Sequence, residues 1–165
     1  MNIHEYQAKR ILSRYGINIP KGGIAYTPNE AKRVAFRSSL RGPWMLKAQI
    51  QSGARNKGYF LEKKAGNRGG VRLVKSRLDI IHQAEQMLGS TLVTVQTGPK
   101  GKLVSRVYVE SYVKVTSIFY AGLAVDRLNA ALTLLIAEIK DEDISQIALN
   151  APEKILKIQL DLEGY

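Results

Sequence analysis

The fold is decided by the stretch Trp44-Met45-Leu46-Lys47-Ala48-Gln49-Ile50 and by the loop after it, Ser52-Gly53-Ala54-Arg55-Asn56-Lys57-Gly58. The first part is an apolar run typical of a strand and contains one lysine. The second part is rich in glycine and basic residues, and a second apolar run follows at Val71–Val74. A strand lysine supplies a fixed point charge, and glycines let backbone N–H groups approach anionic oxygens. The pattern indicates a polyphosphate-binding segment, with a surface strand and a basic hairpin loop as the simpler alternative.

Composition limits the class of protein. At 165 residues and 45% hydrophobic content, the chain can bury one ordinary core. The sequence has no apolar run of transmembrane length, so we expect no membrane association, and its first residues have no signal-peptide character. It contains no cysteine, which excludes disulfides, thiolate zinc sites and thiol nucleophiles. His4 and His82 are far apart and do not form a metal-ligand pattern.

Charge is distributed unevenly along the chain. Residues 1–137 contain 22 Lys and Arg against 7 Asp and Glu, whereas residues 138–165 contain 3 against 7. An excess of +15 in the first part favours an anionic partner, such as nucleotide phosphates, nucleic acid or an acidic protein surface. A solvated basic surface without a dedicated partner is the alternative that charge alone leaves open.

Three helices are predicted from capping signals. Asn2 as N-cap, with Glu5 three residues later, starts a helix that should end at Tyr15. Thr27-Pro28-Asn29-Glu30 starts a second helix running to about Leu40. Ser76-Arg77-Leu78-Asp79 starts a third, which should end before Gly89.

Strands are predicted from apolar alternation. We expect residues 44–50 and 71–74 to be antiparallel neighbours, and residues 92–97 to form a hairpin with residues 103–110. Residues 117–126 should pair with residues 131–136, and a short helix over 144–149 precedes a last strand over 155–160. This order predicts an α+β fold with mixed, mostly antiparallel sheets.

A series of motifs carries a resemblance to a known family. In chain order they are Met1-Asn2-Ile3-His4-Glu5-Tyr6-Gln7-Ala8-Lys9, Tyr15-Gly16, Gly42-Pro43-Trp44, Lys47-Ala48-Gln49, Gln96-Thr97-Gly98-Pro99, Val125-Asp126-Arg127 and Ala151-Pro152-Glu153-Lys154-Ile155. Together they resemble the β subunit of succinyl-CoA synthetase (succinate–CoA ligase), collinearly over essentially the whole chain. The segment Gly58 to Asn67 resembles a longer loop found in some bacterial and mitochondrial members.

The resemblance implies an ATP-grasp fold, in which two lobes clamp a nucleotide. Residues 21–113 would form the smaller, nucleotide-binding lobe, and residues 1–20 and 114–165 would belong to the larger one. The family joins succinate to coenzyme A with ATP or GTP and magnesium, in the tricarboxylic acid cycle. It does so through a phosphohistidine on a partner α subunit, and it implies a bacterial cytoplasmic or mitochondrial matrix location.

Site residues follow from the same resemblance. Lys47 would hold the nucleotide phosphates, the loop Gly53, Ala54, Arg55, Asn56 and Lys57 would cover them, and Glu110 would accept hydrogen bonds from the ribose or base. Val113 would complete the nucleotide site. These roles agree with the chemistry of a point-charge lysine, loop amides and an acceptor carboxylate. A solubilising edge-strand Lys47 and a surface-capping Glu110 are the structural alternatives.

The sequence departs from the family at these motifs. The family loop usually reads His-Ala-Gly-Gly-Arg-Gly-Lys, so Ala54 and Asn56 replace glycines. If either position needs a positive φ, the backbone is strained, and Asn tolerates this better than Ala. An acidic family residue is missing near Ser117–Tyr120, and the segment from Ala137 to Asp141 replaces a family Ser-Thr-Glu-Gly-Gly.

Length is a further departure, because family members are well over twice as long. The absent part would supply the magnesium ligands and the C-terminal CoA-ligase domain, so we expect the chain to be a truncated ATP-grasp region that is inactive alone. The alternative is a non-catalytic descendant that serves as a basic structural or interaction subunit, on RNA or in a large assembly. A regulatory ATP-binding module without chemistry is a third hypothesis.

Overall fold

The computed structural model describes residues 3–37, 40–127, 129–139 and 144–160. The chain divides into two compact units, residues 1–113 and 114–165, which are described separately. The elements in chain order are α1 (Glu5–Arg14), β1 (Gly22–Ala25), α2 (Pro28–Ala35), β2 (Trp44–Ala48), β3 (Tyr59–Phe60), η1 (Lys63–Ala65), β4 (Val71–Val74), α3 (Arg77–Met87), β5 (Thr91–Val93), β6 (Lys102–Leu103), β7 (Val107–Ser111), β8 (Ile118–Asp126), β9 (Ala131–Ile139), α4 (Ile144–Asn150), η2 (Pro152–Lys154) and β10 (Leu156–Leu160).

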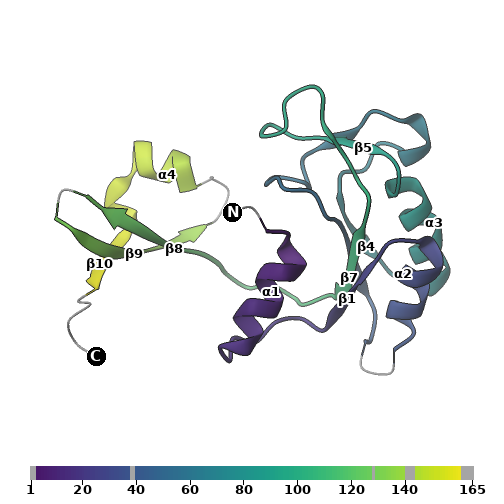
Figure 1. The fold of residues 1–165 in the computed structure, drawn as a ribbon, viewed down its shortest axis with the longest axis horizontal. Coiled ribbons are helices and arrows are strands. Elements are labelled where there is room, and N and C mark those ends of the chain that lie inside the picture. The colour runs from purple at the N-terminus through teal and green to yellow at the C-terminus, as the bar shows by residue number, and fades with distance from the viewer. Residues whose placement is uncertain (1–2, 38–39, 128, 140–143, 161–165) are drawn as a thin grey trace. The chain divides into compact units, whose positions relative to one another are not determined.

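A four-stranded antiparallel sheet is the centre of the first unit, with strand order β1-β7-β2-β4 (Figure 1). The predicted antiparallel pairing of β2 with β4 is confirmed. In β2, Lys47 lies opposite Val71 on one side and Tyr108 on the other. Met45, two residues earlier, lies opposite Glu110 of β7. The register therefore brings Lys47 and Glu110 to neighbouring positions on adjacent strands.

Side chains alternate between the two faces of this sheet, as the strand geometry requires. Trp44, Leu46 and Ala48 of β2 are buried in the core, which α2 and α3 cover. Lys47 and Glu110 lie on the opposite face, where α1 contacts both of them. The apolar face therefore stabilises the unit, and the charged face is left for the α1 contact.

Two of the three predicted helix starts are confirmed. Thr27 Oγ1 accepts a hydrogen bond from the Glu30 N–H at 3.1 Å. Ser76 Oγ accepts from the Asp79 N–H at 3.1 Å. Helix α2 ends at Ala35, earlier than the predicted Leu40.

The start of α1 differs from its prediction. The N-cap is His4, not Asn2, and the Gln7 side chain accepts a hydrogen bond from the His4 N–H at 2.8 Å. Because Gln7 has the reciprocal capping role predicted for Glu5, the Glu5 carboxylate is available for contacts outside the helix.

The predicted hairpin of residues 92–97 with 103–110 is largely wrong. Strand β5 pairs with β6 over two positions only, in a small sheet of order β3-β5-β6. Strand β7 instead enters the four-stranded sheet between β1 and β2. Val107 to Glu110 are all buried, and such a strand gains more from two neighbours and two covered faces than from an exposed hairpin.

A buried arginine fixes the chain after β3. Arg72 is 1% exposed and donates hydrogen bonds to the carbonyls of Ala65, Arg68 and Gly69. It also donates to the side chains of Gln83 and Gln86, both at 2.7 Å. Burial, and then the nearby Arg68, lower the pKa of Arg72 to about 10. These bonds hold residues 65–69 against α3.

The second unit contains a three-stranded antiparallel sheet of order β10-β9-β8 and the short helix α4. The predicted pairing of β8 with β9 and the last strand are confirmed. The α+β class with antiparallel sheets is confirmed for the described residues. The assignment of residues 1–20 and 114–165 to a larger lobe stays a prediction. Among the described residues, no helix is both long and apolar enough to span a membrane.

Candidate functional site

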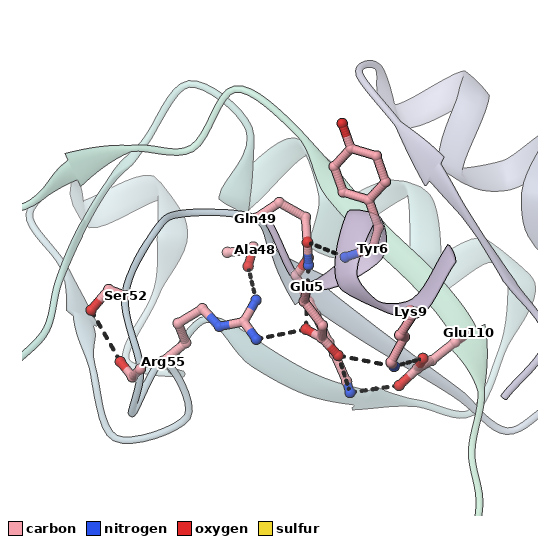
Figure 2. Close-up of polar contacts among 10 residues, drawn as sticks. Glu5, Tyr6, Lys9, Ala48, Gln49, Ser52, Arg55 and Glu110 are labelled. Atoms are coloured by element: carbon pink, nitrogen blue, oxygen red, sulfur yellow. Dashed lines mark hydrogen bonds and ion pairs between the residues drawn. The ribbon is translucent and has the colours of Figure 1, made fainter. Parts of the chain in front are cut away.

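A cluster of opposite charges lies where α1 meets the polar face of the four-stranded sheet (Figure 2). Lys47 Nζ is 2.9 Å from Glu5 Oε1 and 2.5 Å from Glu110 Oε1. Lys9 Nζ is 2.9 Å from Glu5 Oε1 and also contacts Glu110 Oε2. The two lysines therefore bridge the same two carboxylates, one from the helix and one from β7.

Arg55, from the loop after β2, completes the cluster. Its Nη2 lies 2.6 Å from Glu5 Oε2, and its Nη1 donates to the Ala48 carbonyl at 2.6 Å (Figure 2). The Gln49 side chain accepts from the Tyr6 N–H at 3.3 Å and so adds a neutral contact between β2 and α1. Three cations surround two carboxylates, so the cluster of Glu5, Lys9, Lys47, Arg55 and Glu110 has a formal charge of +1.

The pKa values in the cluster reflect this pairing. Burial alone would raise the pKa of Glu5, but the charges and hydrogen bonds of Lys47 and Arg55 outweigh it and hold that pKa well below its usual range. Burial would lower the pKa of Lys9, yet hydrogen bonds to Glu110 and Glu5 raise it. Burial, and then the charge of Glu110, raise the pKa of the Tyr108 hydroxyl. Both Glu5 and Lys9 are therefore held in their charged forms.

The loop after β2 is anchored at its start and at its end. Gly53 N–H donates to Gln96 Oε1 at 2.6 Å, and the hydroxyls of Ser52 and Thr94 are 2.5 Å apart. Farther along, Gly70 N–H donates to the Arg55 carbonyl at 2.8 Å. A Cβ at position 69 would lie 2.4 Å from the Asn56 carbonyl oxygen, so this close approach requires glycine there.

The backbone of the loop is strained at one residue. Ala54 has φ of +51°, a backbone conformation that is common for glycine and tolerated by asparagine but rarely adopted by other residues. Asn56, the other replacement of a family glycine, does not have positive φ. The predicted strain therefore falls on Ala54, the residue that tolerates it less well.

A cavity of about 500 Å³ opens beside this loop. Its lining includes Glu5, Ser52, Gly53, Arg55 and Gln96 and is mostly polar. An anion entering it would meet the Arg55 guanidinium and the loop backbone. It would also meet the Glu5 carboxylate, which is already paired with the cations that the anion would bind.

The predicted site residues are divided between this cluster and its surroundings. The structure joins Lys47 and Arg55 through Glu5, and it joins Glu110 to them through Lys47. Gly53, Ala54, Asn56 and Lys57 are exposed in the adjoining loop. Val113, which is 53% exposed, lies two residues past β7 and outside the cluster. Their roles in nucleotide binding remain predictions.

Two residues of the cluster were missed from the sequence, Glu5 and Lys9. Their i, i+4 spacing on one helix face predicts a local ion pair, which is present. Nothing in that spacing indicates that the pair also contacts residues about forty and one hundred positions away.

The described residues contain no group of three or more His, Cys, Asp or Glu that could hold a metal ion. The prediction that the magnesium ligands lie outside this chain is not tested by this observation. The cluster has only two carboxylates, and lysine already occupies both of them.

Two solved structures illustrate the similarity of the fold to known proteins. The chain matches the dinucleotide-forming acetyl-coenzyme A synthetase 1 of Candidatus Korarchaeum cryptofilum with a TM-score of 0.65 and 15% identity, over 98% of this chain and 60% of that one. It matches the ATP citrate lyase of Methanothrix soehngenii with a TM-score of 0.62 and 15% identity, over 99% of this chain and 35% of that one. At these identities the likeness defines the fold alone.

The fold is that of an ATP-grasp protein. The ATP-grasp domain model matches residues 2–164, and the chain therefore belongs to that family. Within the family it is 47% identical over 162 residues to the succinate–CoA ligase [ADP-forming] subunit beta of Rhodospirillum rubrum, and 46% identical over 162 residues to that of Erythrobacter litoralis. Each match covers 98% of this chain and 40% of the relative, so the chain spans about two fifths of their length. The resemblance found in the sequence is thereby confirmed.

Replacing Ala54 by glycine should stabilise the protein by about 0.5–1 kcal/mol. Glycine relieves the cost of positive φ, about 1–2 kcal/mol, and loses part of that gain to its freer unfolded chain. Urea unfolding measures the change. Ala48→Gly, in a buried strand, is the control and should destabilise. Equal destabilisation by the two variants would contradict strain at position 54.

Replacing Glu5 by glutamine should change how stability depends on pH. Because the pKa of Glu5 is lower in the folded protein, its contribution is present above the ordinary value of 4.5 and is lost as the pH falls below it. At pH 7 we expect Glu5→Gln to cost about 1–2 kcal/mol, since it leaves Lys47 and Arg55 less well paired. Between pH 6 and pH 3 the variant should lose less stability than the wild type.

Glu85→Gln is the control, because Glu85 is an exposed residue of α3 outside the cluster. Its stability should follow the wild-type curve in denaturant titrations across the same pH range. A Glu5→Gln curve parallel to the wild type would show that the Glu5 contacts do not contribute to folding.

Proposed function

We propose that residues 1–113 bind the phosphates of ATP or ADP through Lys47, Arg55 and the loop Gly53 to Lys57. One observation carries the proposal: Lys47 and Arg55 are already placed around a single anionic group, the Glu5 carboxylate, beside a polar cavity. Two cations converging on one carboxylate can also converge on a phosphate, which presents more charge and more acceptor oxygens.

Phosphate binding requires an exchange at this cluster. The nucleotide phosphates take the place of the Glu5 carboxylate on Lys47 and Arg55, and the loop N–H groups add hydrogen bonds. The Lys47 ammonium acts as a point charge, whereas the Arg55 guanidinium can donate two parallel bonds. Glu110 remains on β7 as the acceptor for ribose hydroxyls or a base N–H group, with Val113 beside the nucleotide. The proposal includes magnesium bound together with the nucleotide. It also includes GTP and GDP as alternatives to ATP and ADP.

The larger function follows from the relatives. We propose that the chain is the nucleotide-binding part of a succinate–CoA ligase β subunit, in the reaction succinyl-CoA + ADP + phosphate ⇌ succinate + CoA + ATP of the tricarboxylic acid cycle. An α subunit would be its partner, in a bacterial cytoplasm or a mitochondrial matrix. The support is 47% identity along the chain to a protein of that name. Because the chain spans 40% of that relative, we expect it to be incompetent alone.

Isothermal titration with Mg-ATP tests nucleotide binding. Lys47→Ala should weaken ATP binding at least tenfold, about 1.4 kcal/mol, since it removes the point charge on the phosphates. Lys9→Ala is a matched control, because Lys9 contacts the same two carboxylates and is given no phosphate contact. Lys9→Ala should change affinity by less than threefold. Equal losses in the two variants, or no ATP binding by the wild type, would contradict the proposal.

A reconstitution assay tests the activity. The chain mixed with α subunit, succinate, coenzyme A and Mg-ATP should form no thioester above the level without the chain. A full-length β subunit in the same mixture is the positive control. Thioester formation by this chain would show that the missing part is dispensable and would contradict the predicted incompetence.

A further inference from the structure

Part of the basic excess lies outside the cluster around Lys47. Six exposed cations line two cavities on the first unit, and we call them the basic surface: Arg10, Lys21, Arg37, Arg41, Lys75 and Arg77. Arg10 comes from α1 and Lys21 from the segment before β1. Arg37 and Arg41 lie between α2 and β2, and the last two cations are at the start of α3. The charge imbalance in the sequence is thus partly gathered at one place in the fold.

The two cavities are adjacent because they share Arg37. The first, of about 710 Å³, has Arg10, Lys21 and Arg37 in its lining. The second, of about 590 Å³, has Arg37 together with Arg41 and two cations of the α3 start. Each is large enough for a group of nucleotide size. A ligand that spans both must be elongated and must carry anionic groups along its length.

No acidic residue lines either cavity. Within the part of the chain that the structure describes, none of the six side chains has an ion-pair partner. The six acidic residues of the first unit lie elsewhere, and Glu5 and Glu110 are taken by the cluster around Lys47. The basic surface is therefore electrostatically uncompensated, which favours binding of a polyanion.

The start of α3 adds a second electrostatic feature. Lys75 and Arg77 flank the N-cap Ser76, at the positive end of an eleven-residue helix. Cations at this end are unfavourable by a few tenths of a kcal/mol to about 1 kcal/mol each. A phosphate bound at this end of the helix would make the electrostatic energy of both cations favourable. The placement is costly without an anion and favourable with one.

Aromatic rings accompany these cations. Tyr6 lines the first cavity and is partly exposed, whereas Tyr108 in that cavity and Trp44 in the second are only 6% and 5% exposed and are not available for stacking. Phe36, next to Arg37, is 49% exposed, and the Arg77 guanidinium lies 4.5 Å from its ring centroid. Cationic grooves with aromatic rings bind single-stranded nucleic acids, because phosphates meet the cations and bases stack on the rings.

We propose that the basic surface binds single-stranded nucleic acid, independently of the nucleotide site. The two sites use different residues, since Lys47, Arg55 and Glu110 line neither of these cavities. The strand runs across both cavities, with its backbone phosphates on the six cations.

Fluorescence anisotropy with labelled oligo-uridylate and oligo-thymidylate of twelve residues, at 50–200 mM salt, tests the proposal on the full chain. The triple variant Arg37→Gln, Arg41→Gln, Arg77→Gln should bind at least tenfold more weakly at the lowest salt. Its plot of log affinity against log salt should be shallower by about 2, since each phosphate contact on a single strand contributes about 0.7 to the slope. Comparison of the two oligonucleotides shows whether the ligand is RNA or DNA.

The matched control is Lys63→Gln, Lys100→Gln, Lys102→Gln, which removes the same charge from exposed lysines outside the basic surface. It and Lys47→Ala should each keep oligonucleotide affinity within about threefold of the wild type. Circular dichroism melting establishes that all variants are folded. Equal losses in the two triple variants, loss of binding in Lys47→Ala, equal competition by poly-glutamate, or no wild-type binding at 50 mM salt would each overturn the proposal.

Discussion

The pairing of Lys47 with Glu5 and Glu110 is the contact on which the placement of α1 against the sheet depends. It joins β2 to β7 within the sheet and attaches α1 to the sheet from outside. Residues Glu5–Arg14 contain no buried residue, so this helix has little apolar area to hold it in place. Its attachment relies on partly buried ion pairs and a few hydrogen bonds. Electrostatic contacts position α1, whereas burial of apolar side chains positions α2 and α3.

The elements that the sequence predicted well are those whose signals are local. Thr27 and Ser76 cap helices through their own neighbours, and residues 118–126 pair with the strand that follows them in the chain. The hairpin to β7 failed because its competitor, a place between β1 and β2, is created by residues more than fifty positions away. No local sequence pattern indicates stabilisation that comes from strands so distant in the chain.

The candidate site shows the same limit. Lys47, Arg55 and Glu110 could be named from the resemblance to the family, and the strand lysine and the basic loop are also contiguous in sequence. Glu5 could not, because its role depends on where α1 is placed and on Gln7 taking over the cap. The strain at Ala54 was foreseen as a choice between two positions, and only the backbone geometry resolved it.

The two groups of cations respond differently to a change of charge. Around Lys47, every cation is already paired with a carboxylate. A new anion must displace a carboxylate, so its binding free energy is only the difference between the new ion pairs and the old ones. On the basic surface the cations have solvent as their partner, so a polyanion gains counterion release without breaking ion pairs. Affinity at the first site is therefore expected to depend on shape and on the number of hydrogen bonds. Affinity at the basic surface is expected to depend on the salt concentration. The nucleotide and the nucleic acid need not compete, because they bind at different sites.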